Sequence, residues 1–231
     1  MTAVEHSRTV ASTPSREPLQ IPVAGVTLDA DLCLPQAAKG VVLFAHGSGS
    51  SRFSPRNRHV ATLLNEAGLA TVLADLLTPE EEIVDERTRH LRFDIELLAE
   101  RLVGVTDWLA RNDSTAKLPI AHFGASTGAA GALVAAAERP GLVRAVVSRG
   151  GRPDLAGESL PHVQAPTLLI VGGNDVQVIV LNRRALDLLP GDKQLVIVPG
   201  ATHLFEEPGA LDEVASLARD WFLRHLQVAA R

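Results

Sequence analysis

The sequence has few of several residue types, and each shortage narrows what the protein can do. Its 231 residues include a single cysteine, Cys33, and no tyrosine. One cysteine cannot form an intrachain disulfide or a thiolate zinc cluster, and this usage fits a reducing cytoplasm. No apolar run approaches the roughly 20 residues of a membrane span. The formal net charge of −5 argues against nucleic acid as a partner. We therefore expect neither a membrane nor a nucleic acid as partner.

The first 18 residues also lack an apolar core. They read MTAVEHSRTVASTPSREP, which predicts a polar tail and not a secretory signal. Residues 19–231 show no internal repeat and no second linker, and their length fits one α/β domain. The oligomeric state stays open at this stage, with a homo-oligomer among the options.

Two kinds of apolar run follow the tail. VTLDADLCL, residues 26–34, alternates between apolar and polar side chains, which predicts a strand with one wet face in an antiparallel part of a sheet, with LQIPV before it as its partner. Cys33 falls on the wet side, where we expect a structural and not a reactive role. Six later runs are nearly continuous in apolar residues, as parallel strands covered on both faces are: VVLFAHG, LATVLADLL, LPIAHFGAS, VRAVVSRGG, TLLIVGGND and QLVIVPG.

Helical stretches alternate with these runs. Ser54 and Pro55 predict an N-cap followed by proline in the first turn, and Gly68 predicts the end of that helix. Further helices are expected at 93–112, 126–138, 178–189 and 210–226. The alternation predicts a doubly wound, mostly parallel sheet with helices on both faces. Because ligands of such sheets lie beyond the carboxyl ends of the strands, functional residues should follow the apolar runs.

One strand end carries a recognisable motif. Gly124-Ala125-Ser126-Thr127-Gly128 matches G-x-S-x-G between a strand and a helix, the pattern of a nucleophile elbow. The sharp turn strains the serine backbone, and the glycines let strand and helix approach closely. The alternative is that Ser126 only caps the helix.

A nucleophilic serine needs a base and an acid that orients it. His203, in PGATHLFEEPG, follows the last strand in a glycine-bounded loop that can reach a neighbouring strand end. Asp175, in VGGNDVQV, ends a strand between the serine and the histidine, although it also fits a simple helix cap. Asp75 breaks the chain order Ser, Asp, His, and Asp154 follows a strand that supplies the acid less often. We predict the triad Ser126, Asp175 and His203.

Backbone amides should stabilise the oxyanion of the tetrahedral intermediate. The amide of Thr127, directly after the nucleophile, is one candidate. The second should come from His46-Gly47-Ser48-Gly49, after the first parallel run, with Ser48 preferred and Gly49 next.

These residues resemble the α/β-hydrolase superfamily over nearly the whole chain after the tail. DLLTPEEE, SRGGRPDL and PGATHLFEEPG are similar to stretches of its dienelactone hydrolase-like branch, which includes proteins fused to phosphoribosyltransferase domains. The resemblance implies the α/β-hydrolase fold and catalytic roles for Ser126, Asp175 and His203. Dienelactone hydrolases proper use cysteine as nucleophile, so the resemblance carries over an esterase-type mechanism but not the lactone substrate.

The region between two strands at 152–165 is too short for a cap domain, so the site should be open or roofed by loops. Arginines gather at the expected rim, and guanidinium forks suit carboxylate or phosphate; they are Arg52, Arg56, Arg58, Arg149 and Arg152. Arg149 and Arg152 are thus candidates to bind a substrate anion. We favour the alternative, in which these arginines pair with the acidic loop of Glu80, Glu81, Glu82 and Asp85.

The sequence therefore predicts a cytoplasmic serine hydrolase of small or medium carboxylic esters, with a small-molecule ester as its partner and with no metal or organic cofactor. Acyl transfer to an acceptor other than water is one alternative. The other is a binding scaffold that kept the fold and lost turnover.

Overall fold

In the computed structural model of the protein, residues 15–227 are described. One sheet contains eight strands: β1 (Arg16–Val23), β2 (Val26–Cys33), β3 (Val41–Ala45), β4 (Ala70–Ala74), β5 (Ile120–Ala125), β6 (Val143–Arg149), β7 (Thr167–Gly172) and β8 (Lys193–Val198). The α-helices of this part of the chain are α1 (Pro55–Glu66), α2 (Pro79–Thr88), α3 (Ile95–Leu109), α4 (Thr127–Glu138), α5 (Val176–Leu188) and α6 (Ala210–His225). Two 3-10 helices are η1 (Leu91–Phe93) and η2 (Pro153–His162).

The strands lie in the order β1-β2-β4-β3-β5-β6-β7-β8. The run from β4 to β8 is parallel, whereas β2 is antiparallel to both β1 and β4. The predicted doubly wound, mostly parallel sheet with an antiparallel edge is therefore confirmed. The predicted tail is wrong at its boundary, because Arg16, Glu17 and Pro18 already belong to β1; residues 1–14 of the tail lie outside the described residues.

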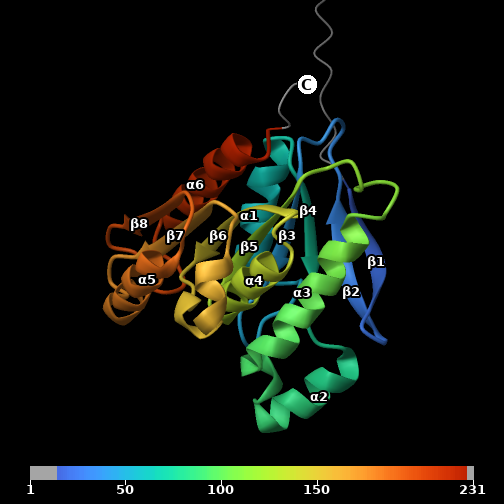
Figure 1. Cartoon of the computed structure of the whole chain (residues 1–231), viewed down its shortest axis with the longest axis horizontal. Helices are drawn as coiled ribbons and strands as arrows, with labels where there is room; N and C mark the ends of the chain where they lie inside the picture. The colour runs from blue at the N-terminus through green and yellow to red at the C-terminus, as the bar shows by residue number, and fades with distance from the viewer. Residues whose placement is uncertain (1–14, 228–231) are drawn as a thin grey trace, which may run out of the picture.

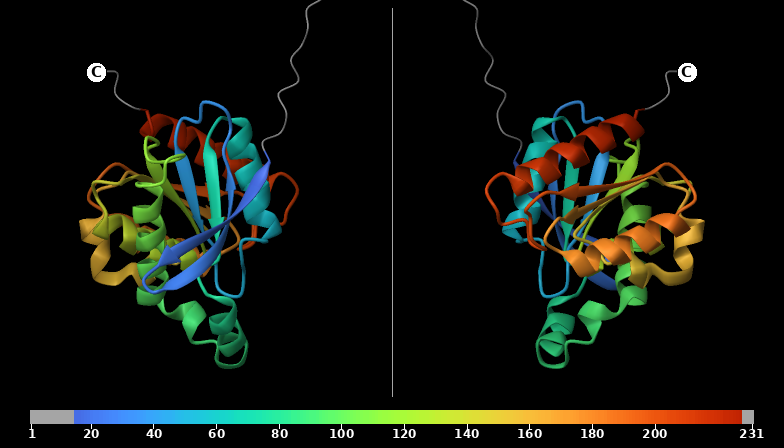
Figure 2. Two further views of the ribbon diagram at one scale, coloured as in Figure 1. Left: turned by 90° about the vertical axis from the view of Figure 1, so that its right-hand side faces the viewer. Right: turned by 90° about the vertical axis from the view of Figure 1, so that its left-hand side faces the viewer.

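Helices cover both faces of the sheet (Figures 1 and 2). Side chains of α1 and α6 form one apolar core with the strands, and side chains of α3, α4 and α5 form the core of the opposite face. Strands β3, β4 and β5 are buried at every position, as their continuous apolar sequences require. The carboxyl ends of the parallel strands consequently meet at one edge of the sheet.

The expected helix signals are present, with small shifts in the bounds. The Ser54 side chain accepts a hydrogen bond from Asn57 N and caps α1, and Gly68 follows its end with a φ of +83°. Helix α3 begins later than predicted because Asp94 caps it, accepting from Leu97 N at 3.0 Å. Helix α5 begins directly after Asp175, two residues before the predicted start.

Helix α2 corrects the prediction of an acidic loop. Thr78 and Glu81 form a capping box, in which each side chain binds the backbone amide of the other residue. The helix has no apolar face: Ile83 and Val84 are both exposed. Ion pairs connect α2 to the segments that follow it: Arg101 of α3 binds Glu81 at 2.8 Å, and Arg92 of η1 binds Asp85. Apolar periodicity therefore could not reveal it. In Figure 1, α2 projects away from the helical layers.

Cys33 shares a face of β2 with the partly exposed Asp29 and Asp31, as the alternation predicts, but its own position on that face is buried and not wet. The side chain is 3% exposed. In the register of the sheet it lies between Arg16 of β1 and Thr71 of β4, and the Arg16 guanidinium extends over this face to Thr62 of α1. Burial raises the pKa of the Cys33 thiol, which fits the expected structural role.

His122 is held inside the sheet, as predicted for a residue of this strand. It is completely buried, and its Nδ1 lies 3.2 Å from the carbonyl oxygen of Ala132, so Nδ1 carries the proton. Nε2 lies 2.9 Å from the Thr106 hydroxyl. Burial lowers the pKa of His122 from 6.5 to about 4.

This buried histidine should make stability depend on pH. Between pH 6.5 and 4 the unfolded chain binds a proton at His122 and the folded chain does not. The contribution of the neutral His122 to the free energy of unfolding is therefore complete above pH 6.5 and is lost as the pH falls toward 4. We expect the free energy of unfolding to fall between pH 7 and 5 by about 2 kcal/mol more in the unmodified protein than in His122→Gln. Urea unfolding at both pH values measures this difference. His46, whose pKa burial also lowers, is present in both proteins. Equal losses would contradict the prediction.

Candidate active site

Ser126 lies at the turn between β5 and α4, with φ 51° and ψ −123°. This left-handed conformation is uncommon for a residue other than glycine and indicates backbone strain. The flanking glycines permit the turn: a Cβ on Gly124 would lie 2.4 Å from Ala129 Cα, and one on Gly128 would lie 2.3 Å from Ala45 O. The Ser126 side chain makes no hydrogen bond that caps α4. The geometry is thus that of a nucleophile elbow and not of a capping serine.

Three loops bring the predicted triad together. Nε2 of His203, in the loop after β8, lies 3.4 Å from Ser126 Oγ, and its Nδ1 lies 2.6 Å from Oδ2 of Asp175, after β7. The Nδ1 contact places the proton on that nitrogen and leaves Nε2 as the acceptor that faces the serine. A contact of this length tightens in a catalytic site when a substrate is bound.

The contacts of the three candidate aspartates distinguish Asp175 from Asp154 and Asp75. Asp175 occupies the N-cap position of α5, but its side chain makes no capping hydrogen bond and binds His203 instead. Asp154 binds Arg152 through both carboxylate oxygens, at 2.9 and 2.8 Å. Asp75 binds Arg52. Of the three candidates, only Asp175 contacts the histidine.

The loop that carries His203 is fixed on both sides of the imidazole. Phe205 is buried, with a positive φ of 55°. Hydrogen bonds from the Thr202 hydroxyl and from the amides of Glu207 and Thr202 lower the pKa of the Glu207 carboxyl. A backbone hydrogen bond from Phe205 N to Thr202 O, at 3.2 Å, closes the turn around His203. Sequence reasoning missed Phe205 and Glu207; the pair Glu206-Glu207 after the histidine was the available signal.

The predicted oxyanion donors lie close together beside Ser126. The amide of Thr127 is the first of α4 and has no carbonyl one turn earlier to bind. The Ser48 amide donates to the Thr127 hydroxyl at 2.9 Å. For Ser48 to bind an oxyanion, this hydrogen bond has to be shared or exchanged. Gly47 brings the loop close to Ser126, since a Cβ at position 47 would lie 3.0 Å from Ser126 Cβ.

A cavity of about 240 Å³ opens at Ser126. Its lining comes from the loop after β3, the first turn of α1, the ends of β5 and β6, and the histidine loop: Gly47, Ser48, Ser50, Ser54, Arg56, Asn57, Ala125, Ser126, Arg149, His203 and Leu204. Sequence reasoning missed Ser50, Ser54, Asn57 and Leu204. The rule that ligands lie beyond strand ends pointed to these loops, but it did not show that α1 begins beside the site.

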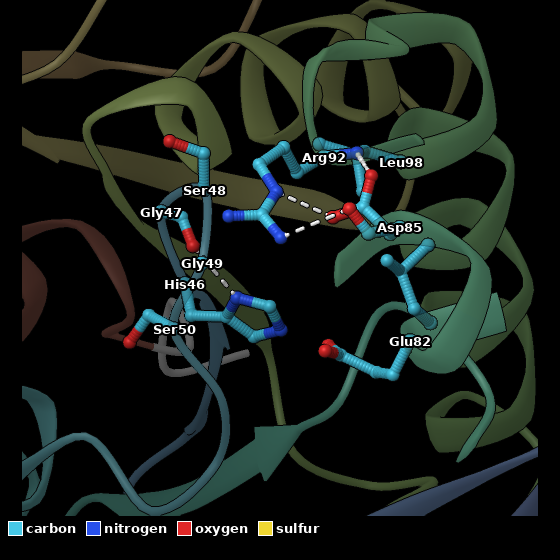
Figure 3. A pocket seen from close by; sticks show the side chains of 10 residues that line it. His46, Gly47, Ser48, Gly49, Ser50, Glu82, Asp85, Arg92 and Leu98 are labelled. Carbon is cyan, nitrogen blue, oxygen red and sulfur yellow. Dashed lines mark hydrogen bonds and ion pairs between the residues drawn. The ribbon is translucent and has the colours of Figure 1, made fainter. Parts of the chain in front are cut away.

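Gly49 lies on the other side of the same loop. It lines a separate pocket of about 10 Å³, roughly the space of one water molecule, together with His46, Glu82, Asp85 and Arg92 (Figure 3). His46 is nearly fully buried; its Nε2 accepts from Leu76 N at 3.2 Å and its Nδ1 lies 3.0 Å from Gly47 O. A Cβ on Gly49 would lie 2.9 Å from the Arg92 guanidinium. These contacts hold the loop in place, and this pocket is too small for an ester.

The expectation that the rim arginines pair with the acidic segment Glu80, Glu81, Glu82 and Asp85 is wrong, because they pair with other carboxylates. That segment folds as α2, and two of its carboxylates bind the arginines that follow it in the chain, Arg92 and Arg101. Four rim arginines pair elsewhere: Arg52 with Asp29, Asp31 and Asp75, Arg58 with Asp31, Arg56 with Glu206, and Arg152 with Asp154. Arg149 has no ion pair with any described residue.

Residues 15–227 contain no group of three or more His, Cys, Asp or Glu side chains placed to hold a metal ion. In the same part of the chain, no helix combines the length and the apolar character needed to cross a membrane.

Comparisons with known proteins bear on the fold and the family of the chain. A solved dienelactone hydrolase from Anabaena variabilis ATCC 29413 is 62% identical, with a TM-score of 0.92 over 93% of this chain and 100% of that one. Est1E from Butyrivibrio proteoclasticus shares the fold at 18% identity, with a TM-score of 0.75 over 90% of this chain and 98% of that one.

A curated relative from Mycobacterium tuberculosis (strain CDC 1551 / Oshkosh) bears the name "Putative phosphoribosyl transferase". It is 61% identical over 210 residues, which make up 91% of this chain and 46% of that protein. The chain thus spans about half the length of the curated relatives it matches. The model of the dienelactone hydrolase family matches residues 28–229. With this match and the eight-stranded sheet, the chain has the α/β-hydrolase fold and belongs to the dienelactone hydrolase family.

Proposed function

We propose that the protein is a serine hydrolase of small or medium carboxylic esters that works through an acyl-enzyme. The observation that carries this proposal is the chain of contacts from Ser126 Oγ through His203 to Asp175, with the serine on a strained turn. Backbone strain of this kind persists where the surrounding structure holds it, and it is concentrated at functional sites. The family match supports a hydrolase, and the cavity supports a small substrate.

The proposed reaction follows from the roles of the three side chains. Ser126 Oγ attacks the ester carbonyl carbon while its proton passes to Nε2 of His203. The amide of Thr127 stabilises the oxyanion, joined by Ser48 once its bond to the Thr127 hydroxyl is exchanged. The bond between the former carbonyl carbon and the alcohol oxygen then breaks, and His203 gives the proton to this departing oxygen. Asp175 orients the imidazole and stabilises its charged form throughout.

Water completes the cycle. It attacks the acyl-enzyme carbonyl carbon and loses a proton to His203 Nε2. The bond from that carbon to Ser126 Oγ then breaks, Oγ takes the proton back from His203, and the acid is released. An alcohol in place of this water would make the same machinery an acyltransferase. We extend the proposal to a cytoplasmic location, which the single buried cysteine supports.

Turnover of p-nitrophenyl acetate tests the proposal. We expect release of p-nitrophenolate in proportion to protein concentration, and the free acid as the main product when short alcohols are added. An alkyl ester as the main product would indicate acyl transfer. No turnover of this ester or of a panel of short esters, thioesters and lactones would favour a binding scaffold and contradict the proposal.

A further inference from the structure

Strand β8 forms one edge of the eight-stranded sheet, and within residues 15–227 it pairs with β7 alone. Its register with β7 is unbroken, and Asp192 O, directly before the strand, accepts a hydrogen bond from Thr167 N at 2.9 Å. Backbone groups of successive strand residues point to opposite sides, so those of Asp192 face β7 and those of Lys193, Leu195 and Ile197 face outward. This edge therefore presents a row of N–H and C=O groups that no other strand of the described chain pairs with.

Strand β8 lacks the usual protection of an edge. Charged side chains and prolines are common means by which edge strands avoid pairing with another chain. The sequence of β8, KQLVIV, contains no proline and a single charged residue, Lys193. The Lys193 ammonium donates to the carbonyl oxygen of Leu189, directly after α5, at 2.5 Å, so it is turned toward the end of that helix. In the right-hand view of Figure 2, β8 lies between α5 and α6.

The opposite edge of the sheet, β1, is protected by proline. Asp29 O accepts a hydrogen bond from Asp75 N, directly after β4, at 2.9 Å, so the backbone groups of Asp29 and Asp31 face β4. Pro18 is the partner of Asp31 in β1, and its backbone, like that of Pro22, therefore faces outward. Proline has no N–H, so β1 offers no donor at these two positions. One edge of the sheet is thus guarded against pairing and the other is open.

Helix α5 adds apolar surface beside the open edge. It packs on β7 and β8, and the side chains of Val176, Val180 and Leu188 are exposed. Leu195 packs against the apolar core that α5 covers, so Leu195 and α5 lie on the same face of the sheet. Interfaces between identical subunits are more apolar than the rest of a protein surface. An apolar helix surface next to an open strand fits such an interface.

We propose that two copies of the chain associate through β8, with the two strands antiparallel about a two-fold axis at Leu195. In this register Leu195 pairs with Leu195 of the partner subunit, and Lys193 pairs with Ile197 of the partner subunit. Every outward N–H and C=O of these residues then forms a hydrogen bond, and the two sheets become one.

This arrangement is complementary to itself, which favours a second copy over an unrelated partner. The two Lys193 side chains lie at opposite ends of the contact, so like charges do not meet, and the two α5 helices share one face of the joined sheet. The inference does not rest on the proposed function, because no residue of the Ser126 cavity takes part in it.

Sedimentation equilibrium of the full chain over a dilution series tests this assembly. We expect a dimer that dissociates to monomers on dilution. Leu195→Pro removes the central outward-facing donor from each copy and leaves the hydrogen bonds to β7 intact. It should raise the dissociation constant by at least about 30-fold, because two backbone hydrogen bonds are lost from the interface. A chain that is monomeric at every concentration would overturn the inference.

Gln20→Pro is the matched control for this variant. Gln20 is exposed and faces outward between Pro18 and Pro22, so a third proline at this edge should leave the dissociation constant of the dimer unchanged. A dimer that Leu195→Pro does not weaken, or that Gln20→Pro weakens as much, would place the interface elsewhere and refute the role of β8.

Hydrogen exchange measured by NMR needs no variant and decides the question if Leu195→Pro does not fold. In the dimer the amides of Leu195 and Ile197 are bonded across the interface, whereas that of Val196 faces β7. We expect dilution from dimer to monomer to speed exchange at least about tenfold at positions 195 and 197 and to leave Val196 unchanged. Exchange at Leu195 that does not respond to dilution would contradict the inference, whether it is fast, as at an open edge, or slow, as at an edge covered within one chain.

Discussion

Ser126→Ala should lower kcat/KM for p-nitrophenyl acetate by four to six orders of magnitude, on the order of the losses caused by removal of a triad member. The alanine has no Oγ to form the acyl-enzyme, while the cavity and the Thr127 amide remain. The free energy of unfolding should change little, because the side chain makes no capping bond in α4 and alanine retains the strained backbone.

Ser148→Ala is the matched control for this substitution. Ser148 is a buried serine of the adjacent strand whose hydroxyl has no hydrogen-bond partner among the described residues. We expect that variant to keep the rate of the unmodified protein. A Ser126→Ala protein that kept a tenth of the activity or more would refute the nucleophile assignment.

Asp175→Asn should lower kcat by about four orders of magnitude while it changes KM much less. The carboxylate accepts the Nδ1 proton of His203 and thereby keeps Nε2 free to accept the serine proton. An asparagine amide can donate to Nδ1 and stabilise the wrong tautomer, which is the reason given for a loss of this size in a serine protease triad. Steady-state kinetics at fixed pH measures the split between kcat and KM.

Asp154→Asn and Asp75→Asn serve as comparisons for the acid. Asp154 binds Arg152 and Asp75 binds Arg52, so we expect milder kinetic effects from both, with some loss of stability where the Arg52 ion pairs weaken. If Asp154→Asn were the crippling variant, Asp154 would be the acid and the contact seen at Asp175 would be secondary.

Features with a strong local cause were predictable from the sequence. The continuous apolar runs predicted the parallel strands, since side chains buried on both faces must be apolar, and Ser54-Pro55 predicted the start of α1. Helix α2 was missed because ion pairs and a capping box hold it and it has no apolar stripe. The burial of Cys33 was missed because Arg16, its partner on the neighbouring strand, and α1, which Arg16 contacts at Thr62, lie far from it in the sequence or outside the alternating pattern.

In the candidate site, too, some features were predictable from the sequence and others were not. Chain order and strand ends selected Ser126, Asp175 and His203, and the structure brings all three into contact. The partners of the arginines depend on which loops meet in space, and that is not encoded in local pattern. Arg152 is paired two residues away, whereas Arg149 is buried against Asn57, 92 positions earlier in the chain.

A fluorophosphonate modifies activated serines, so the residue that it labels shows whether Ser126 is the nucleophile. We expect one phosphonyl group per chain, on the peptide that contains Ser126, with labelling greatly slowed in Asp175→Asn. Absence of labelling, or a label on another serine that Ser126→Ala leaves unchanged, would contradict this expectation.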